Sequence, residues 1–210
     1  VLFYMASLIF GMTLANSVVE EKQSRIVEII ATKIPVRQLL AGKVAGNTAI
    51  AVAQMALYAA IGLIGLRFTP YASFLPSVGG ALGWFLVFFL VGFLLIACLW
   101  AVAGALASRT EDVQSTATPV TMLLLAIFFG SMFLDGTAQT VLSYVPPASA
   151  VLMPQRILDG SALWWEPIVA LAILVAAAGV VVLVAERLYR RSLLQTQGTL
   201  SMRQAWSAPE

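Results

Sequence analysis

Apolar residues along this chain gather in long stretches that charged residues interrupt only at intervals. Charged side chains are missing altogether from residues 44–66, 68–108, 113–134 and 167–185, and a further apolar run covers residues 1–18. A helix needs about 20 mostly apolar residues to cross the hydrocarbon core of a bilayer. The pattern therefore predicts five membrane-spanning helices, at about 1–18, 44–66, 80–107, 113–134 and 167–185.

Composition supports the same fold class. Apolar residues make up 60% of the chain and charged residues 10%, whereas soluble domains average about 45–50% and 25%. These figures exclude a soluble globule and a disordered chain, and a net charge of +2 gives no reason to expect nucleic acid as a partner. We expect an all-α polytopic membrane protein, with residues 1–188 as a transmembrane permease domain and residues 189–210 as a cytoplasmic tail.

Cysteine and histidine usage removes several kinds of site. Cys98 is the single cysteine, so no disulfide within the chain is possible, and histidine is absent. Without histidine there is no His-based metal site, Ser-His-Asp triad or histidine proton shuttle. The chain starts at Val1 in an apolar run that no basic residues precede, so we expect no signal peptide and expect the C-terminal part of a longer chain.

Basic residues are concentrated on one side of the predicted membrane domain. Of the 12 lysines and arginines, only Arg67 and Arg156 fall in connections on the opposite side. Cytoplasmic loops of membrane proteins carry the excess of lysine and arginine. We therefore expect a multi-pass protein of the plasma membrane, with the start of the chain outside and the C-terminus in the cytoplasm.

The connection over residues 135–166 is more than a simple loop. It contains an apolar stretch, residues 141–153, that Pro146 and Pro147 interrupt and Pro154 follows. This stretch is too short and too broken to cross the bilayer and return. It predicts a re-entrant or interfacial segment on the outer side, where neighbouring helices or water satisfy its free backbone groups.

Residues 19–43 carry a pattern that a plain turn between two spans does not require. Glu21, Arg25 and Glu28 recur at i, i+4 and i+7, which places them on one helical face. Isoleucines at i, i+3 and i+4 form an apolar stripe, and Pro35 ends the helix. This amphipathic elbow either lies on lipid headgroups or docks on a protein. Its mixed charges favour a protein partner, because helices that bind only lipid are mostly basic on their polar face.

The same residues carry a family resemblance. Residues 19–30 read VEEKQSRIVEII, and residues 39–46 read LLAGKVAG. Together they resemble the signature of ABC-2 type permeases, most closely the sodium-efflux-like and multidrug-like exporters. The family usually has six spans and an outer domain between the first and second. By this resemblance, we expect the chain to begin at the position of the second span, without the first span and that domain.

The resemblance implies an ATP-driven exporter in which two permease subunits, identical or different, bind two copies of a separate cytoplasmic ABC ATPase. ATP and Mg²⁺ would bind to the ATPase, and the elbow would be the coupling helix that docks on it. The residues that this assigns to the coupling helix are Glu20, Glu21, Lys22, Arg25, Ile26, Glu28, Ile29 and Ile30. Those assigned to the turn that follows are Pro35, Leu39, Leu40, Gly42 and Lys43.

The energy source can be argued from the residues themselves. A P-loop requires Gly-x-x-x-x-Gly-Lys-Ser/Thr, but Gly42-Lys43 is followed by Val44, and Arg37 stands where the first glycine is needed. The predicted spans contain no carboxylate, lysine, arginine or histidine, which disfavours an ion-coupled secondary transporter. They also lack the paired carboxylates of an intramembrane aspartyl protease. We expect no enzymatic activity in this chain. The alternative to an exporter subunit is a non-transporting scaffold or a channel subunit, and a neighbouring gene for an ABC ATPase would favour the exporter.

Small and polar residues within the spans indicate how the helices pack. Gly42 with Gly46, Gly62 with Gly65, and Gly104 with Ser108 have spacings that permit close backbone approach. Uncharged polar residues within the spans either form hydrogen bonds between helices or line a path. They are Thr48, Gln54, Ser115, Thr116, Thr118 and Thr121.

Overall fold

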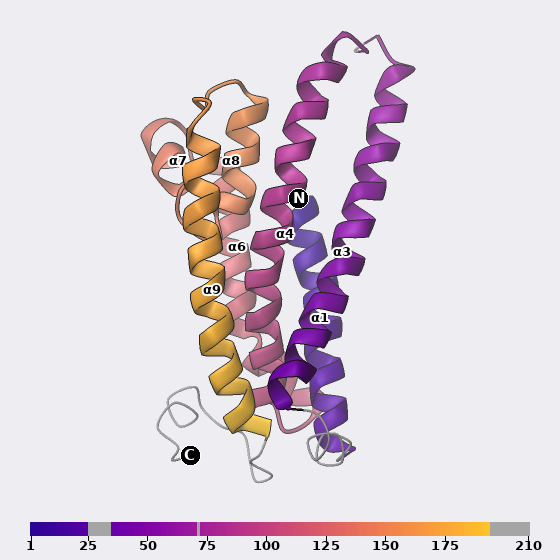
Figure 1. Ribbon diagram of the computed structural model, residues 1–210, viewed down its shortest axis with the longest axis vertical. Coiled ribbons are helices and arrows are strands. Elements are labelled where there is room, and N and C mark those ends of the chain that lie inside the picture. The colour runs from indigo at the N-terminus through magenta and orange to yellow at the C-terminus, as the bar shows by residue number, and fades with distance from the viewer. Residues whose placement is uncertain (25–34, 71, 194–210) are drawn as a thin grey trace.

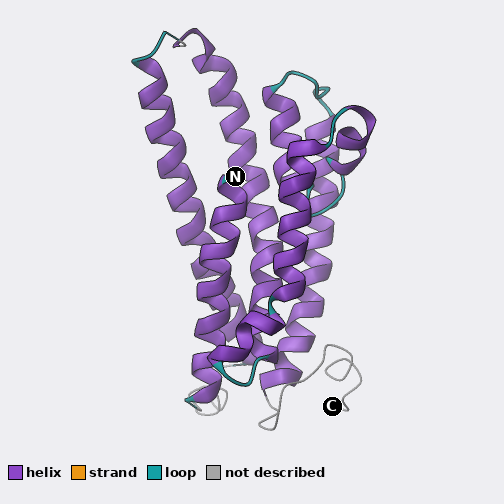
Figure 2. Cartoon of the chain, turned by 180° about the vertical axis from the view of Figure 1, so that it is seen from behind, coloured by secondary structure: helices purple, strands orange, loops and turns teal. Residues whose placement is uncertain are grey.

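The computed structural model of the chain describes residues 1–24, 35–70 and 72–193, and within these residues it contains helices and no strands (Figures 1 and 2). The long helices are α1 (Leu2–Gln23), α3 (Val36–Arg67), α4 (Leu75–Leu106), α6 (Thr118–Phe133) and α9 (Glu166–Leu193). Short elements connect them: η1 (Ala72–Phe74), η2 (Thr110–Asp112), α5 (Val113–Thr116), α7 (Gly136–Leu142) and α8 (Ser149–Leu158). The expected all-α membrane fold is confirmed.

Helices α1, α3, α4 and α9 are each long and apolar enough to cross a membrane. The η2–α5 and α6 segments together make a fifth candidate span, bent by 47° between Thr116 and Thr118. Pro119 lies in the first turn of α6, and because proline has no N–H to donate, it interrupts the helical hydrogen bonds at the bend. The expected span 113–134 is therefore a broken helix.

Helices α1 and α3 extend beyond the spans predicted for them. We expected the first span to stop at residue 18 and the second to start at residue 44, but α1 continues to Gln23 and α3 already begins at Val36. The turn residues Leu39, Leu40, Gly42 and Lys43 therefore lie in the first turns of α3. A helix continues as long as its backbone hydrogen bonds are maintained and no residue breaks it. The charged residues 20–22 therefore lie within α1 and do not end it.

Helix α4 is the centre of the bundle. In its most apolar window 61% of residues are buried inside the protein, against 11% for α3 and 22% for α9. Helices α1, α3, α8 and α9 all pack against it, while α3 and the first part of α4 extend beyond the other helices at one end (Figure 1).

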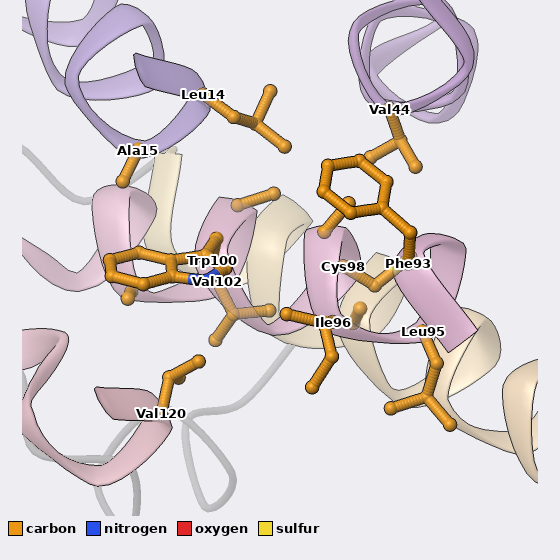
Figure 3. Close-up of a cluster of buried hydrophobic side chains, with 14 of the residues drawn as sticks. Leu14, Ala15, Val44, Phe93, Leu95, Ile96, Cys98, Trp100, Val102 and Val120 are labelled. Carbon is orange, nitrogen blue, oxygen red and sulfur yellow. The ribbon is translucent and has the colours of Figure 1, made fainter. Parts of the chain in front are cut away.

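Aromatic side chains of α4 form the core against α1. Phe89 and Phe93 stack with ring centroids 5.5 Å apart, and each meets an α1 ring edge-on, Phe3 at 5.8 Å and Phe10 at 6.3 Å. Further along α4, Trp100 is fully buried beside Ala15 and Val120 (Figure 3). Offset and edge-on ring pairs add about 0.5–1.5 kcal/mol each beyond their buried area.

Close approach of helices depends on glycine at particular positions. A Cβ on Gly104 would lie 2.4 Å from the carbonyl oxygen of Ala15, and one on Gly11 would lie 2.3 Å from Trp100 Nε1. Gly92 makes a similar approach to Ala150 of α8, at 2.4 Å. The expectation for Gly104 is confirmed. A Cβ on Gly42, Gly46, Gly62 or Gly65 would meet nothing within 4 Å in the described part of the chain.

Candidate functional site

The connection between α1 and α3 is the first candidate site, because the predicted coupling helix falls there. Glu20, Glu21 and Lys22 form the last turns of α1, and Pro35 caps the start of α3. The remaining predicted residues, Arg25, Ile26, Glu28, Ile29 and Ile30, lie outside the described residues.

An ion pair joins the two described ends of this connection. Lys43 of α3 donates to Glu21 Oε1 of α1 at 2.9 Å and to the hydroxyl of Ser17 at 2.7 Å. The lysine side chain is 11% exposed and the glutamate 30%, so the pair is partly shielded from solvent. We call Ser17, Glu21 and Lys43 the α1–α3 cluster. It holds Ser24 and Pro35, the two ends of the connection, on adjacent helices.

Lys22 bonds in a different direction from Glu21. Its Nζ donates to the carbonyl oxygens of Ala105 at 2.8 Å and Ala107 at 3.3 Å, at the C-terminal end of α4. A cation there satisfies carbonyls that have no partner within the helix and complements the negative end of the helix dipole. The end of α1 is thus attached both to α3 and to the central helix, while the side chain of Glu20 is exposed.

The polar residues predicted within spans fall into two groups. The hydroxyls of Ser115, Thr118 and Thr121 donate to carbonyls of their own or the adjoining helical segment. Gln54 donates to the hydroxyl of Tyr58 one turn later. Thr116 Oγ1 instead reaches Ala103 O of α4 at 2.8 Å. Thr48 is 4% exposed, and its hydroxyl finds no hydrogen-bond partner among the described residues.

A second polar cluster lies at the opposite end of the bundle, and the sequence analysis did not single it out. Arg156 of α8 and Glu166 of α9 form an ion pair with Nη2 and Oε2 2.6 Å apart. Both residues are buried, with 4% and 7% exposure. Arg156 Nη1 also donates to Ser143 Oγ at 2.9 Å, and Nη2 to Ser161 O at 3.3 Å. We call Ser143, Arg156, Ser161 and Glu166 the α8–α9 cluster.

Tyr144 adjoins the α8–α9 cluster. Burial raises the pKa of its phenol above the ordinary value, the charge of Glu166 raises it further, and Arg156 opposes both effects. The phenol is therefore neutral at physiological pH. The signal that would have identified this cluster is Arg156 itself, an isolated base within an otherwise apolar and proline-containing segment.

Two pockets open near this end of the bundle. One, of about 560 Å³, is lined by Gly136, Thr137, Gln139, Thr140, Arg156 and Ser161. The other, of about 290 Å³, lies between α1, α4 and α8 and is almost entirely apolar, with Leu2, Ala81, Phe85, Val151, Pro154 and Leu158 among its lining. Neither holds three or more side chains that could bind a metal, and the described residues contain no such group.

The polar clusters therefore attach helices to one another, and the rest of the site is apolar surface. Comparisons with known proteins identify the family. The model of the family described as ABC-2 family transporter protein matches residues 1–185. The chain belongs to this family. It is a multi-pass protein of the ABC-2 membrane type, as the resemblance of residues 19–46 predicted.

Two curated relatives are similar in sequence to this chain but are longer. The uncharacterized protein YhaP of Bacillus subtilis is 29% identical over 205 residues, which cover 91% of this chain and 49% of the relative. The uncharacterized protein MJ1024 of Methanocaldococcus jannaschii is 25% identical over 150 residues, covering 69% of this chain and 36% of the relative. This ABC-2 chain thus spans half or less of the length of these relatives. No solved structure matches it significantly.

Proposed function

We propose that the chain is the membrane-spanning permease part of an ATP-binding-cassette exporter, driven by a separate cytoplasmic ATPase. The match of the ABC-2 family model to residues 1–185 is the observation that carries this proposal. The permease would form the translocation path, and ATP and Mg²⁺ would bind to the ATPase. The side chain of Lys43, the lysine of the Gly-Lys pair, is already engaged by Glu21 and Ser17 within a helix, which argues against a phosphate-binding loop in this chain.

The α1–α3 connection is the proposed coupling element. A helix transmits force only if its ends are attached to the parts that must move. Here Glu21 pairs with Lys43 of α3, and Lys22 bonds to the end of α4. The residues on either side of 25–34 are therefore bonded to each other and to the end of α4, so this segment is anchored to three helices. Docking of an ATPase on Arg25, Glu28 and the isoleucines between and after them would act directly on the bundle.

The basic end of the bundle is the proposed cytoplasmic side in the plasma membrane. Lys22, Lys43 and Arg109 lie at this end, and the C-terminal end of α9 reaches it too (Figure 1). The α8–α9 cluster would then face the outer leaflet. This orientation follows from the preference of lysine and arginine for cytoplasmic loops.

Association of two permease subunits completes the proposal. Helix α3 is the least buried span, and large apolar side chains such as Ile50, Leu57 and Ile61 are more than half exposed on it. A second subunit or lipid must cover this surface.

For the transported compound, the apolar pocket of about 290 Å³ supports an amphiphile more than a small ion.

The experiment is a co-purification of the full-length protein with the ABC ATPase encoded beside its gene. The complex should hydrolyse ATP, and inverted membrane vesicles should take up a fluorescent lipophilic dye only when ATP is supplied. The permease purified alone should neither bind nor hydrolyse ATP. Saturable ATP binding to the permease alone, or failure to associate with the ATPase, would contradict the proposal and leave a scaffold or channel subunit as the function.

An ion-coupled transporter gains no support from the buried Glu166. A carboxylate that carries a coupling ion must release its partner and become accessible, but Glu166 lies against the guanidinium of Arg156. Arg156 is also bonded to Ser143 and Ser161. The pair therefore suits a mechanical contact between segments better than an ion-binding site.

A further inference from the structure

The α8–α9 cluster places two opposite charges in a nearly dry position at the proposed outer end of the bundle. We propose that Arg156 and Glu166 are positioning residues that form a latch: the ion pair closes α8 onto the start of α9 and opens during the transport cycle. The inference rests on the proposed transport function. The latch would connect movement of α9, which spans the bundle, to movement of the outer segment that α7 and α8 form.

Burial of the pair argues that it does more than stabilise the fold. Arg156 is 4% exposed and Glu166 7%. Removing two charges from water costs about as much as their attraction returns, so apolar residues of similar size often stabilise such a position equally well. A paired charge can separate when water arrives, whereas an apolar contact cannot be switched in this way.

The pair also joins two helix ends. Arg156 lies in the last turn of α8, and Glu166 is the first residue of α9. The linker between them folds back on Arg156, because the amide of Ser161 donates to its carbonyl oxygen at 3.0 Å and the guanidinium donates to Ser161 O at 3.3 Å. Separation of the pair would free the start of α9 from α8, while the linker stays bonded to Arg156 and neither helix has to unfold.

Helix α8 has a second attachment that the latch does not need. Ala150 packs so closely on α4 that a Cβ on Gly92 would lie 2.4 Å from its own Cβ. This contact is apolar and lies on a different part of the α8 surface from Arg156. Ser149 shares the helical face of Arg156, at i and i+7, and is fully buried. Opening of the latch should therefore expose Ser149 while α8 stays on α4.

Water has a route to the pair. The pocket of about 560 Å³ reaches Arg156 and Ser161, and Thr137, Gln139 and Thr140 also line it. Entry of water along this pocket would stabilise the separated charges. The pair is thus buried between α8 and α9 but adjoins a pocket from which water could reach it.

Cysteine labelling tests the latch without any knowledge of the substrate. In full-length protein in membranes, with Cys98→Ser, Ser149→Cys is combined with Glu166→Gln, which removes one charge of the pair. A membrane-impermeant maleimide added from the outer side should modify position 149 at least roughly tenfold faster in the Glu166→Gln protein, because local opening sets the labelling rate.

Ser7→Cys is the matched control. Ser7 and Ser149 are both fully buried, and neither hydroxyl has a hydrogen-bond partner among the described residues. Position 7 lies in α1 and should stay protected in both proteins. The proposal is overturned if position 149 stays protected in the Glu166→Gln protein. It is also overturned if position 7 becomes reactive together with position 149, since the pair would then support the whole fold.

A second variant separates a latch from a structural contact. Arg156→Met with Glu166→Leu replaces the pair by apolar side chains of similar volume and should keep the contact closed. We expect position 149 to remain protected and ATP-dependent dye uptake to fall at least tenfold. Uptake at the parent rate would overturn the latch, as would reactivity at position 149. If the parent complex transports no dye, the proposed function fails, and the labelling comparison still decides whether the pair holds α8.

Discussion

Lys43, two turns into α3, reaches back to Glu21 at the end of α1, with Nζ and Oε1 2.9 Å apart. The sequence pattern had placed Glu21 on the face of a helix that meets an ATPase. In the structure this carboxylate already has a partner inside the permease. We therefore propose that Glu21 holds the ends of the α1–α3 connection together, and that the residues after it meet an ATPase.

Charge reversal tests this pairing. Glu21→Lys or Lys43→Glu alone places like charges together and should lower the free energy of unfolding by about 1 kcal/mol, the range of partly exposed ion pairs. The double variant restores opposite charges and should recover most of the loss, because the Ser17 hydroxyl can donate to a carboxylate as well as accept from an ammonium. Thermal unfolding in detergent measures the effect. A double variant less stable than both single variants would show that the two residues are not coupled.

Gly104 of α4 lies where α1 approaches so closely that there is no room for a Cβ atom. An added Cβ would lie 2.4 Å from the carbonyl oxygen of Ala15, and backbone cannot move aside easily. Gly104→Ala should therefore destabilise the protein by about 1–3 kcal/mol, the usual cost of overpacking. Gly179→Ala is the control, since a Cβ there meets nothing within 4 Å in the described structure. Equal melting temperatures of the two variants would contradict the close contact of α1 with α4.

Thr116 and Thr118 form a matched pair for hydrogen bonding. The Thr116 hydroxyl bonds to Ala103 O of α4, whereas Thr118 bonds to Gln114 O, four residues earlier. Valine has nearly the same shape as threonine but no hydroxyl. Thr116→Val should cost about 0.5–1 kcal/mol, as interhelical hydrogen bonds in membranes do, while Thr118→Val should have a smaller effect. Unfolding in detergent compares them, and the reverse order would contradict the attachment of α5 to α4.

The sequence predicted the helices well because a membrane-spanning helix needs only a sufficient apolar length. Helix ends were predicted less well. Charges at Glu20, Glu21 and Lys22 indicated an exit from the membrane, but a helix continues until its backbone bonds fail, and α1 continues to Gln23. The bend at Pro119 was likewise missed, since residues 113–134 contain no charge that would mark a break in the span.

The polar clusters show the limit of reasoning from periodicity. Ser17 and Lys43 are 26 positions apart in the sequence. The residues between them carry several charges, and nothing in their spacing says that Lys43 pairs with Glu21. Arg156 and Glu166 fell in a segment assigned to the outer surface, where charges are ordinary. Their burial depends on α8 packing against α4 through Ala150 and Gly92, a contact between distant segments that no local pattern records.

Orientation is tested by labelling from one side of the membrane. In the Cys98→Ser protein, cysteines at Ser73 and Thr137 should react with an impermeant maleimide applied to intact cells. Cysteines at Ser24 and Thr110, at the basic end, should react only after the membrane is permeabilised. All four side chains are exposed in the structure, so burial does not confuse the comparison. The opposite pattern would place the α1–α3 connection outside, where no cytoplasmic ATPase can reach it.

The coupling assignment is tested by changing charges within residues 25–34, which lie outside the described residues. Arg25→Glu with Glu28→Lys keeps the net charge of residues 25–34 but reverses its pattern. Like charges juxtaposed across an interface cost several kcal/mol, and a loss of about 3 kcal/mol weakens an equilibrium roughly 150-fold. The variant should therefore lose co-purification with the ATPase and ATP-dependent uptake, yet insert and express normally. Glu21→Lys with Lys43→Glu is the matched control, because it also reverses two charges beside this connection but preserves a contact within the permease. If Arg25→Glu with Glu28→Lys binds the ATPase as the parent does, the connection does not dock on an ATPase, and a helix lying on the lipid surface becomes the better explanation of its pattern.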